Sequence, residues 1–137
     1  MRVLFVDDDA MNRRVVRDML QVAGVTLDEA PDGPSGLSMI DALDYDIILM
    51  DLRMPGMDGL TAIGRIRARS DAKAGLPIVV VTADTSPNIR EECIAAGADE
   101  MLQKPVAMKS LFRMLGQMVA ARTRAAQPVQ TVHVPAE

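Results

Sequence analysis

Three aspartates stand together near the start of the chain, directly after an apolar run. Asp7, Asp8 and Asp9 follow "VLFV", at the point where a strand would end. Closely spaced carboxylates repel one another and raise one another's pKa unless a cation joins them. A hard divalent ion is the usual partner, and Mg²⁺ fits best because it binds through one or two carboxylates and recruits phosphate oxygens. The three aspartates therefore predict a Mg²⁺ site.

Three more polar residues stand at the ends of later apolar runs. Asp51 follows "DIILM", Thr82 ends "IVVVT" and Lys104 follows "EMLQ". An ammonium and a hydroxyl suit the oxygens of a phosphoryl group that a metal already holds. Because no Gly-rich phosphate loop follows the first apolar run, backbone amides are not expected to cradle a nucleotide. Asp51 is then the candidate for a carboxylate that accepts a phosphoryl group covalently.

Each of these residues also has an ordinary structural interpretation. Asp9 suits a turn or a helix cap, Thr82 suits a strand, and Lys104, which precedes a proline, suits a solvated loop. Cys93 falls within a helical pattern, where a small buried filler is favoured over a reactive thiol. The chemical interpretation is favoured because carboxylates, hydroxyl and ammonium would meet at one edge of a parallel sheet.

Composition narrows the class of protein. The chain has 137 residues, of which 49% are hydrophobic, enough for one domain, and its net charge of -4 argues against a direct nucleic-acid partner. One Cys and one His argue against an internal disulfide and a Zn²⁺ site. Without a leader pattern or a run of about 18 apolar residues, we expect a cytoplasmic protein with no membrane insertion. The only histidine, His133, lies in a Pro-containing stretch with nothing to orient it, so it is not expected to be catalytic.

Five strands alternate with five helices in the hydrophobic pattern. Strands are predicted at 3–6, 25–30, 45–51, 76–84 and 100–105, and helices at 11–23, 32–43, 60–66, 87–96 and 108–124. Pro87 is placed in the first turn of the fourth helix, and Val15 in the apolar stripe of the first. This alternation predicts a doubly wound α/β domain with a parallel sheet covered on both faces. The domain is predicted to span residues 1–121, with residues 122–137 as a C-terminal tail or the start of a linker.

The chain resembles the receiver domains of two-component response regulators, the CheY-like family. The resemblance covers residues 1–121 and is carried, in family order, by "VDDD", "MDLRMPGMDG", "VTAD" and "KP". It implies a flavodoxin-like fold with strand order 2-1-3-4-5.

The resemblance also implies a phosphoacceptor function in a phosphorelay. Asp51 would take a phosphoryl group from a phosphohistidine on a histidine kinase or a histidine phosphotransfer protein, and slow autodephosphorylation would return it to rest. Asp8, Asp51 and the backbone carbonyl of Arg53 would hold Mg²⁺, for which Mn²⁺ could substitute, and Asp7 would act through water. Such a domain signals and is not an enzyme that turns over a separate substrate.

A switch residue is also implied, with one departure from the family pattern. Thr82 and Lys104 would contact the phosphoryl oxygens, and Pro105 permits the cis peptide that the family usually has after the lysine. The position that is usually Tyr or Phe is Met101 here. We expect Met101 to be partly exposed in the resting state; a Met101 rigidly buried in both states would rule out switching through it.

Charged residues near the site suggest tuning and steering. Arg53 and Asp84, two residues after Asp51 and Thr82 respectively, could pair and tune the lifetime of the phosphorylated state, or could simply be two solvated loop charges. Arg13, Arg14 and Arg17 form a basic stripe on the first helix, which could steer an acidic donor or could simply be solvated.

Two rival functions stay open. A phosphatase of the haloacid dehalogenase type would use Asp7 with a second acid two residues on, a spacing that Asp9 satisfies but Arg53 after Asp51 does not. The other rival is a degenerate receiver that serves only for docking. "DDDAMNRRVV", "EECIAAGAD" and "KPV" look more like receivers attached to hybrid histidine kinases, although a stand-alone receiver, monomeric or weakly dimeric and with an unknown target, also fits.

Overall fold

A computed structural model describes the backbone of residues 1–125 and the side chains of residues 1–121. Its sheet has five parallel strands in the order β2-β1-β3-β4-β5. The strands are β1 (Arg2–Val6), β2 (Thr26–Ala30), β3 (Ile47–Asp51), β4 (Ile78–Thr82) and β5 (Glu100–Gln103). The helices are α1 (Ala10–Val22), α2 (Gly33–Ala42), α3 (Gly59–Arg67), α4 (Ile89–Ala96) and α5 (Met108–Ala125), with a short 3-10 helix, η1 (Ala72–Gly75). The predicted fold class and strand order are confirmed.

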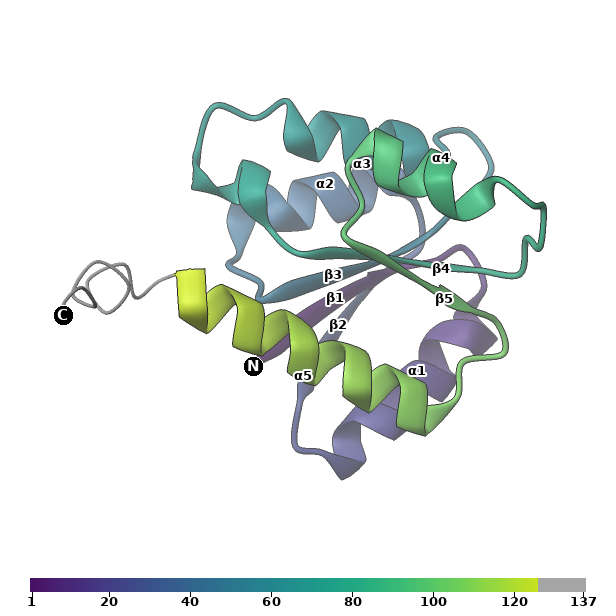
Figure 1. Ribbon diagram of the computed structural model, residues 1–137, viewed down its shortest axis with the longest axis vertical. Coiled ribbons are helices and arrows are strands. Elements are labelled where there is room, and N and C mark those ends of the chain that lie inside the picture. The colour runs from purple at the N-terminus through teal and green to yellow at the C-terminus, as the bar shows by residue number, and fades with distance from the viewer. Residues whose placement is uncertain (126–137) are drawn as a thin grey trace, which may run out of the picture.

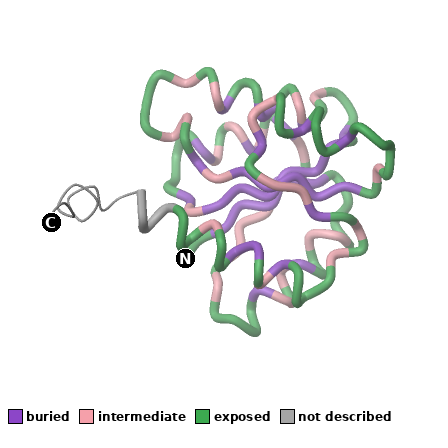
Figure 2. The backbone as a smooth tube through the Cα atoms, in the orientation of Figure 1, coloured by how far each residue is buried: buried purple, intermediate pink, exposed green. Residues whose placement is uncertain are grey.

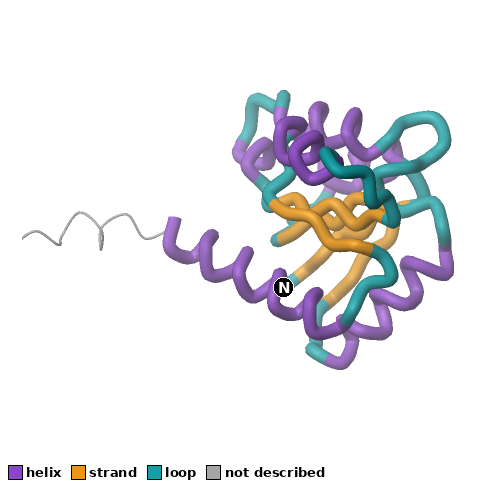
Figure 3. The backbone as a smooth tube through the Cα atoms, turned by 45° about the vertical axis from the view of Figure 1, so that its right-hand side comes forward, coloured by secondary structure: helices purple, strands orange, loops and turns teal. Residues whose placement is uncertain are grey.

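The helices cover both faces of the sheet. Figure 1 shows α2, α3 and α4 on one face and α1 and α5 on the other, and Figure 3 shows the strands between these two helical layers. β3 and β4 lie inside the sheet and are buried along their whole length, which matches their continuous apolar sequences. The buried segments in Figure 2 accordingly gather at the centre of the molecule.

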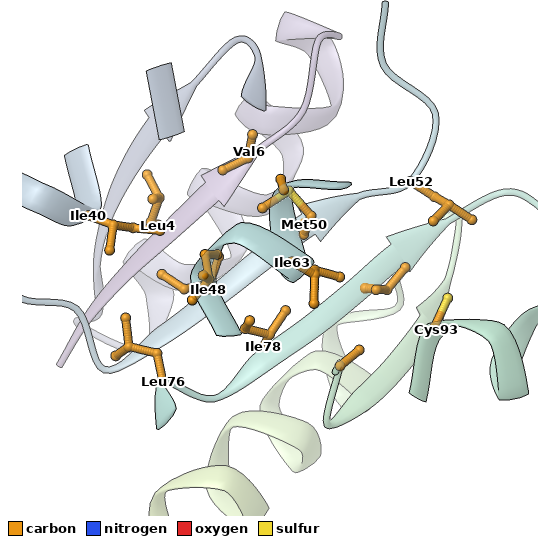
Figure 4. Close-up of a cluster of buried hydrophobic side chains, with 14 of the residues drawn as sticks. Leu4, Val6, Ile40, Ile48, Met50, Leu52, Ile63, Leu76, Ile78 and Cys93 are labelled. Carbon is orange, nitrogen blue, oxygen red and sulfur yellow. The ribbon is translucent and has the colours of Figure 1, made fainter. Parts of the chain in front are cut away.

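Two apolar clusters fill the space between the sheet and its helices. Successive strand residues point to opposite faces, so Leu4 and Val6 join the cluster under α2 to α4, whereas Val3 and Phe5 join the cluster under α1 and α5. Figure 4 shows the first cluster, in which Cys93 of α4 lies among aliphatic side chains. The prediction of a buried Cys93 is confirmed.

Aspartates begin several of the helices. The side chain of Asp9 accepts a hydrogen bond from the backbone N–H of Met11, and Asp32 and Asp58 cap α2 and α3 in the same way through Ser35 and Thr61. Asp9 is therefore a cap residue, as its ordinary interpretation predicted.

Two details of the predicted helices are wrong. Val15 is 43% exposed, because the apolar stripe of α1 is wider than the surface that α1 covers. Pro87 lies in a turn before α4, which begins only at Ile89, because the Ile89 N–H donates to the Ser86 carbonyl and closes that turn first.

The C-terminal helix extends past the predicted domain boundary. α5 continues to Ala125, so the boundary predicted after residue 121 falls within this helix. His133 lies outside the described residues. None of the helices in residues 1–125 combines the length and the apolar character needed to cross a membrane.

Candidate functional site

The carboxyl ends of the strands bring the predicted site residues together. Asp7 and Asp8 follow β1, Asp51 ends β3, and Thr82 ends β4. Single carboxylate oxygens of Asp7, Asp8 and Asp51 all lie within 4.8 Å of one another. An open pocket of about 430 Å³ lies over this edge of the sheet, lined by Asp8, Asp9, Asn12, Asp51, Arg53, Thr82, Ala83, Asp84 and Lys104.

Lys104 joins two of the three acids. Its Nζ lies 3.0 Å from Asp7 Oδ2 and 3.1 Å from Asp51 Oδ1. Asp7 is fully buried and Asp51 is 4% exposed, whereas Asp8 faces the solvent. The ammonium therefore offsets the repulsion between two carboxylates that water cannot screen well.

The pKa values of these groups depend on one another. Burial and then the negative charge of Asp7 raise the pKa of Asp51, Lys104 lowers it, and the net result is a pKa of about 6. Burial alone would lower the pKa of Lys104, but its contacts with Asp7 and Asp51 outweigh burial and raise it. At neutral pH, Asp51 is thus mostly ionised and Lys104 is charged.

The loop after β3 fixes the position of Asp51. Leu52 and Met54 are buried, and the N–H of Gly59 donates to the Leu52 carbonyl at 2.9 Å. A Cβ at position 59 would lie 2.2 Å from the Asp51 carbonyl oxygen, so only glycine allows the start of α3 to approach Asp51 so closely. Packing against the protein interior thus holds this loop in place, while Asp51 faces the pocket.

An ion pair joins the loops that follow β3 and β4. Arg53 Nη2 contacts Asp84 Oδ2, although the Arg53 side chain is 71% exposed. The N–H and hydroxyl of Ser86 also donate to Asp84, at 2.8 and 2.6 Å. These hydrogen bonds and Arg53 lower the pKa of Asp84 to about 2. The Asp84 N–H in turn donates to Thr82 Oγ1 at 3.0 Å, so this ion pair connects directly to the site.

The predicted switch residue lies on the neighbouring edge strand. Met101 is half-buried and packs against the cluster under α2 to α4. Its partial exposure agrees with the expectation for the resting state. The Lys104–Pro105 peptide bond is cis.

The predicted stripe of three arginines on α1 is only partly present. Arg13 Nε and Arg17 Nη1 bind the two carboxylate oxygens of Glu29 at 3.1 and 2.6 Å, so both are paired. Arg14 is exposed and, among the described residues, makes no side-chain hydrogen bond or ion pair. Because β2 lies beside α1 and supplies Glu29, Arg14 is the residue of this stripe that stays exposed and unpaired among the described residues.

Two residues of α1 were missed as parts of the site. Asn12 Nδ2 donates to Asp7 Oδ2 at 3.4 Å, and Arg13 Nη1 donates to the backbone carbonyl of Asp7. The sequence could have indicated this, because both residues lie near the start of the helix that Asp9 caps, and that part of the helix lies next to the end of β1. Asp9, the second acid of the phosphatase interpretation, accepts the cap hydrogen bond from Met11 through Oδ1.

Known proteins have similar sequences and the same fold. The sequence matches the family model of the response regulator receiver domain over residues 3–116. It is 33% identical over 135 residues to the sensory/regulatory protein RpfC of Xanthomonas campestris pv. campestris, which covers 98% of this chain and 19% of that protein. It is 36% identical over 124 residues to the sensor histidine kinase RcsC of Salmonella typhi, which covers 90% of this chain and 13% of that protein.

Structural similarity gives the same assignment. The chemotaxis protein CheY4 of Vibrio cholerae aligns with a TM-score of 0.79 at 33% identity, over 85% of this chain and 97% of that one. The chain spans less than a fifth of the length of the two curated relatives, so the relation concerns one domain. With the family match, the strand order and the acidic pocket in agreement, the chain belongs to the receiver domain family of two-component response regulators.

Proposed function

We propose that Asp51 is the phosphoacceptor of a two-component phosphorelay. The observation that carries this proposal is a nearly buried carboxylate that faces an open pocket beside two further acids and the Lys104 ammonium. A pKa near 6 leaves this carboxylate ionised at neutral pH. The family assignment and the histidine kinase among the relatives support a phosphohistidine donor, on a histidine kinase or a histidine phosphotransfer protein.

The transfer uses positioning and charge rather than acid–base chemistry. A carboxylate oxygen of Asp51 forms a bond to phosphorus while the bond from phosphorus to the donor imidazole breaks, and the bonding electrons leave with the imidazole. Lys104 Nζ, 3.1 Å from Asp51 Oδ1, is placed to contact an oxygen of the transferred group, and Thr82 lines the same pocket. Attack by water later releases phosphate and restores the carboxylate.

The donor atoms of the acidic pocket fit Mg²⁺. They are all carboxylate oxygens, they converge within 4.8 Å, and the pocket is open enough for the ion to keep water ligands. We assign Asp8, Asp51 and the backbone carbonyl of Arg53 as ligands, with Asp7 acting through water, and expect Mn²⁺ to substitute. The bound ion would offset the negative charge that gathers as the phosphoryl group approaches Asp51.

Phosphorylation is proposed to act as a population shift. A phosphoryl group on Asp51 would attract the Thr82 hydroxyl and Lys104, which lie at the ends of β4 and β5. The Lys104 N–H already donates to the Thr82 carbonyl at 2.8 Å, so the two strand ends would move together. Met101, half-buried on β5, would follow by filling the space that Thr82 leaves.

The cellular context is proposed from the relatives. Because the two curated relatives are much longer than this chain, a receiver module of a hybrid histidine kinase is favoured over a stand-alone receiver. We propose a cytoplasmic location and a monomer or weak dimer that signals through a protein surface.

Mg²⁺-dependent labelling tests the proposed function. The chain is incubated with acetyl phosphate, or with a phosphorylated histidine phosphotransfer protein, and the incorporated phosphoryl group is measured by intact mass. Incorporation is expected with Mg²⁺, to be lost in EDTA and to return with Mn²⁺. A folded chain that binds Mg²⁺ but accepts no phosphoryl group from either donor would be a docking module. Turnover of an unrelated phosphate ester would instead support the phosphatase.

The Arg53–Asp84 ion pair is expected to lengthen the life of the phosphorylated state. It links the two loops beside the acceptor, so its loss should open a path for water. Arg53→Ala and Asp84→Ala should each speed autodephosphorylation about two- to fivefold, the range available to an exposed pair. Decay of labelled protein after removal of the donor measures this rate. Arg65→Ala, which removes an exposed charge near the C-terminal end of α3, should change nothing. Unchanged decay in both pair variants would exclude tuning.

A further inference from the structure

The backbone of Asp7 is held at two points, by the edge strand β2 and by a side chain of α1. Its N–H donates to the Ala30 carbonyl at 3.0 Å, and its carbonyl accepts a hydrogen bond from Arg13 Nη1. Arg13 is held by Glu29, the neighbour of Ala30 on β2, through Nε at 3.1 Å. Asp7, α1 and β2 are thus joined in a closed frame beside the acidic pocket.

The hydrogen bond from Arg13 to the Asp7 carbonyl is important because this frame is largely buried. Asp7 is fully buried, and a buried carbonyl needs a partner within the protein or an ordered water. The Arg13 side chain is only 15% exposed and that of Glu29 24%, so the guanidinium has little freedom to leave. Arg17 binds the other oxygen of Glu29 at 2.6 Å and so helps to fix the acid that holds Arg13.

We infer that Arg13 is a positioning residue for the Mg²⁺ site, an inference that rests on the proposed function. Arg13 does not itself line the pocket, but its side chain holds the backbone from which Asp7 and Asp8 project. Glu29 orients Arg13 and acts only through it. Groups that hold metal-binding carboxylates in place contribute to metal affinity although they do not touch the metal.

The sign of the effect separates positioning from simple electrostatics. Removal of a positive charge beside an acidic site strengthens cation binding if only long-range charge matters. Loss of a positioning contact instead weakens it. Arg13→Ala should therefore weaken Mg²⁺ binding about tenfold, the lower end for groups that orient metal ligands. Arg14→Ala removes the same charge from the next residue, which is exposed, and should leave the affinity unchanged or slightly higher.

Calorimetric titration with Mg²⁺, without any phosphodonor, tests the inference. Arg13→Lys keeps the charge but has one nitrogen in place of the two that bind the Asp7 carbonyl and Glu29. Its Mg²⁺ affinity should therefore lie between those of wild type and Arg13→Ala. Glu29→Gln should weaken Mg²⁺ binding roughly threefold, as expected for the loss of a partly exposed ion pair. In the Arg13→Ala background the same substitution should have no effect, because Glu29 acts only by orienting Arg13. If Arg13→Ala does not fold, Arg13→Lys carries the test, because it keeps the charge and loses only the geometry of the guanidinium.

Labelling of Asp51 gives the second readout. At saturating Mg²⁺, the labelling rate of Arg13→Lys should recover to within about twofold of wild type, because a positioning defect in metal binding is overcome by mass action. Suppose that wild type binds Mg²⁺ and is labelled, but that the Arg13 variants bind Mg²⁺ as tightly as wild type or more tightly. This result would overturn the role of Arg13 and leave the proposed function intact. A wild-type chain that binds no Mg²⁺ would overturn the proposed function with it.

Discussion

Asp51→Asn is expected to abolish labelling and, at the same time, to stabilise the domain. The amide keeps the size of the carboxylate and can still accept a hydrogen bond from Lys104, which lies 3.1 Å from Oδ1. It cannot form an acyl phosphate, so incorporation from acetyl phosphate should fall by about a thousandfold or more. Intact mass measured with and without Mg²⁺ is the readout.

The stability gain has a defined pH dependence. The folded pKa of Asp51, about 6, exceeds its ordinary value of 3.8, so the folded state binds this proton more tightly than the unfolded state. Asp51 therefore lowers stability as pH rises from about 4 to 6, and the full penalty applies above pH 6. Asn removes this penalty. Since the pocket opens to solvent, we expect a gain of about 1–2 kcal/mol in the free energy of unfolding at pH 8, which vanishes near pH 4.

Urea unfolding at pH 8 and pH 4 in EDTA measures this gain. A gain of equal size at both pH values would show that the effect does not come from the charge of Asp51. Labelling that persists in Asp51→Asn would move the phosphoacceptor to another residue, and Asp8→Asn is the variant to examine next.

Gly59→Ala is expected to lower the stability of the domain and to displace Asp51. The added Cβ would lie 2.2 Å from the Asp51 carbonyl oxygen and 3.0 Å from Leu52 Cα, and neither backbone atom can move without moving the acceptor. Overpacking of this kind should lower the free energy of unfolding by about 2–3 kcal/mol. A shift of Asp51 by a fraction of an ångström should also slow labelling by about 10- to 100-fold in the protein that remains folded.

Gly64 supplies the matched control in the same helix. A Cβ at Gly64 meets no atom within 4 Å, and the residue is exposed. Gly64→Ala should therefore raise stability by up to about 1 kcal/mol through helix propensity and leave labelling unchanged. Thermal unfolding and the labelling rate, measured for both variants, test these expectations. Equal stability of Gly59→Ala and wild type would show that the start of α3 can move away from β3.

The site could be predicted from the sequence because every parallel strand ends at the same edge of the sheet. Asp51 and Thr82 needed only to stand at the ends of apolar runs for their proximity to follow. Errors of one or two residues in the bounds of the helices did not affect this conclusion. The cap at Asp9 was likewise local, because it depends only on the residues that follow it.

Other features depend on distances that no local pattern contains. The pairing of Arg13 with Glu29 requires α1 to lie over β2 with a particular rotation, which apolar periodicity defines only coarsely. The exposure of Val15 depends on how much of α1 the sheet and α5 can cover. The delayed start of α4 arises because the loop before it is already held by hydrogen bonds of Ser86 to Asp84.

The position of Lys104 has a consequence for the life of the protein before any signal arrives. Its ammonium acts as a counter-ion that the chain carries itself, so the repulsion between two buried carboxylates is partly offset as soon as the protein folds. A pocket that needed a metal to neutralise it would unfold whenever the metal was scarce. Under the proposed function, this domain would stay folded without the metal, so that metal and donor would control its phosphorylation rather than its abundance.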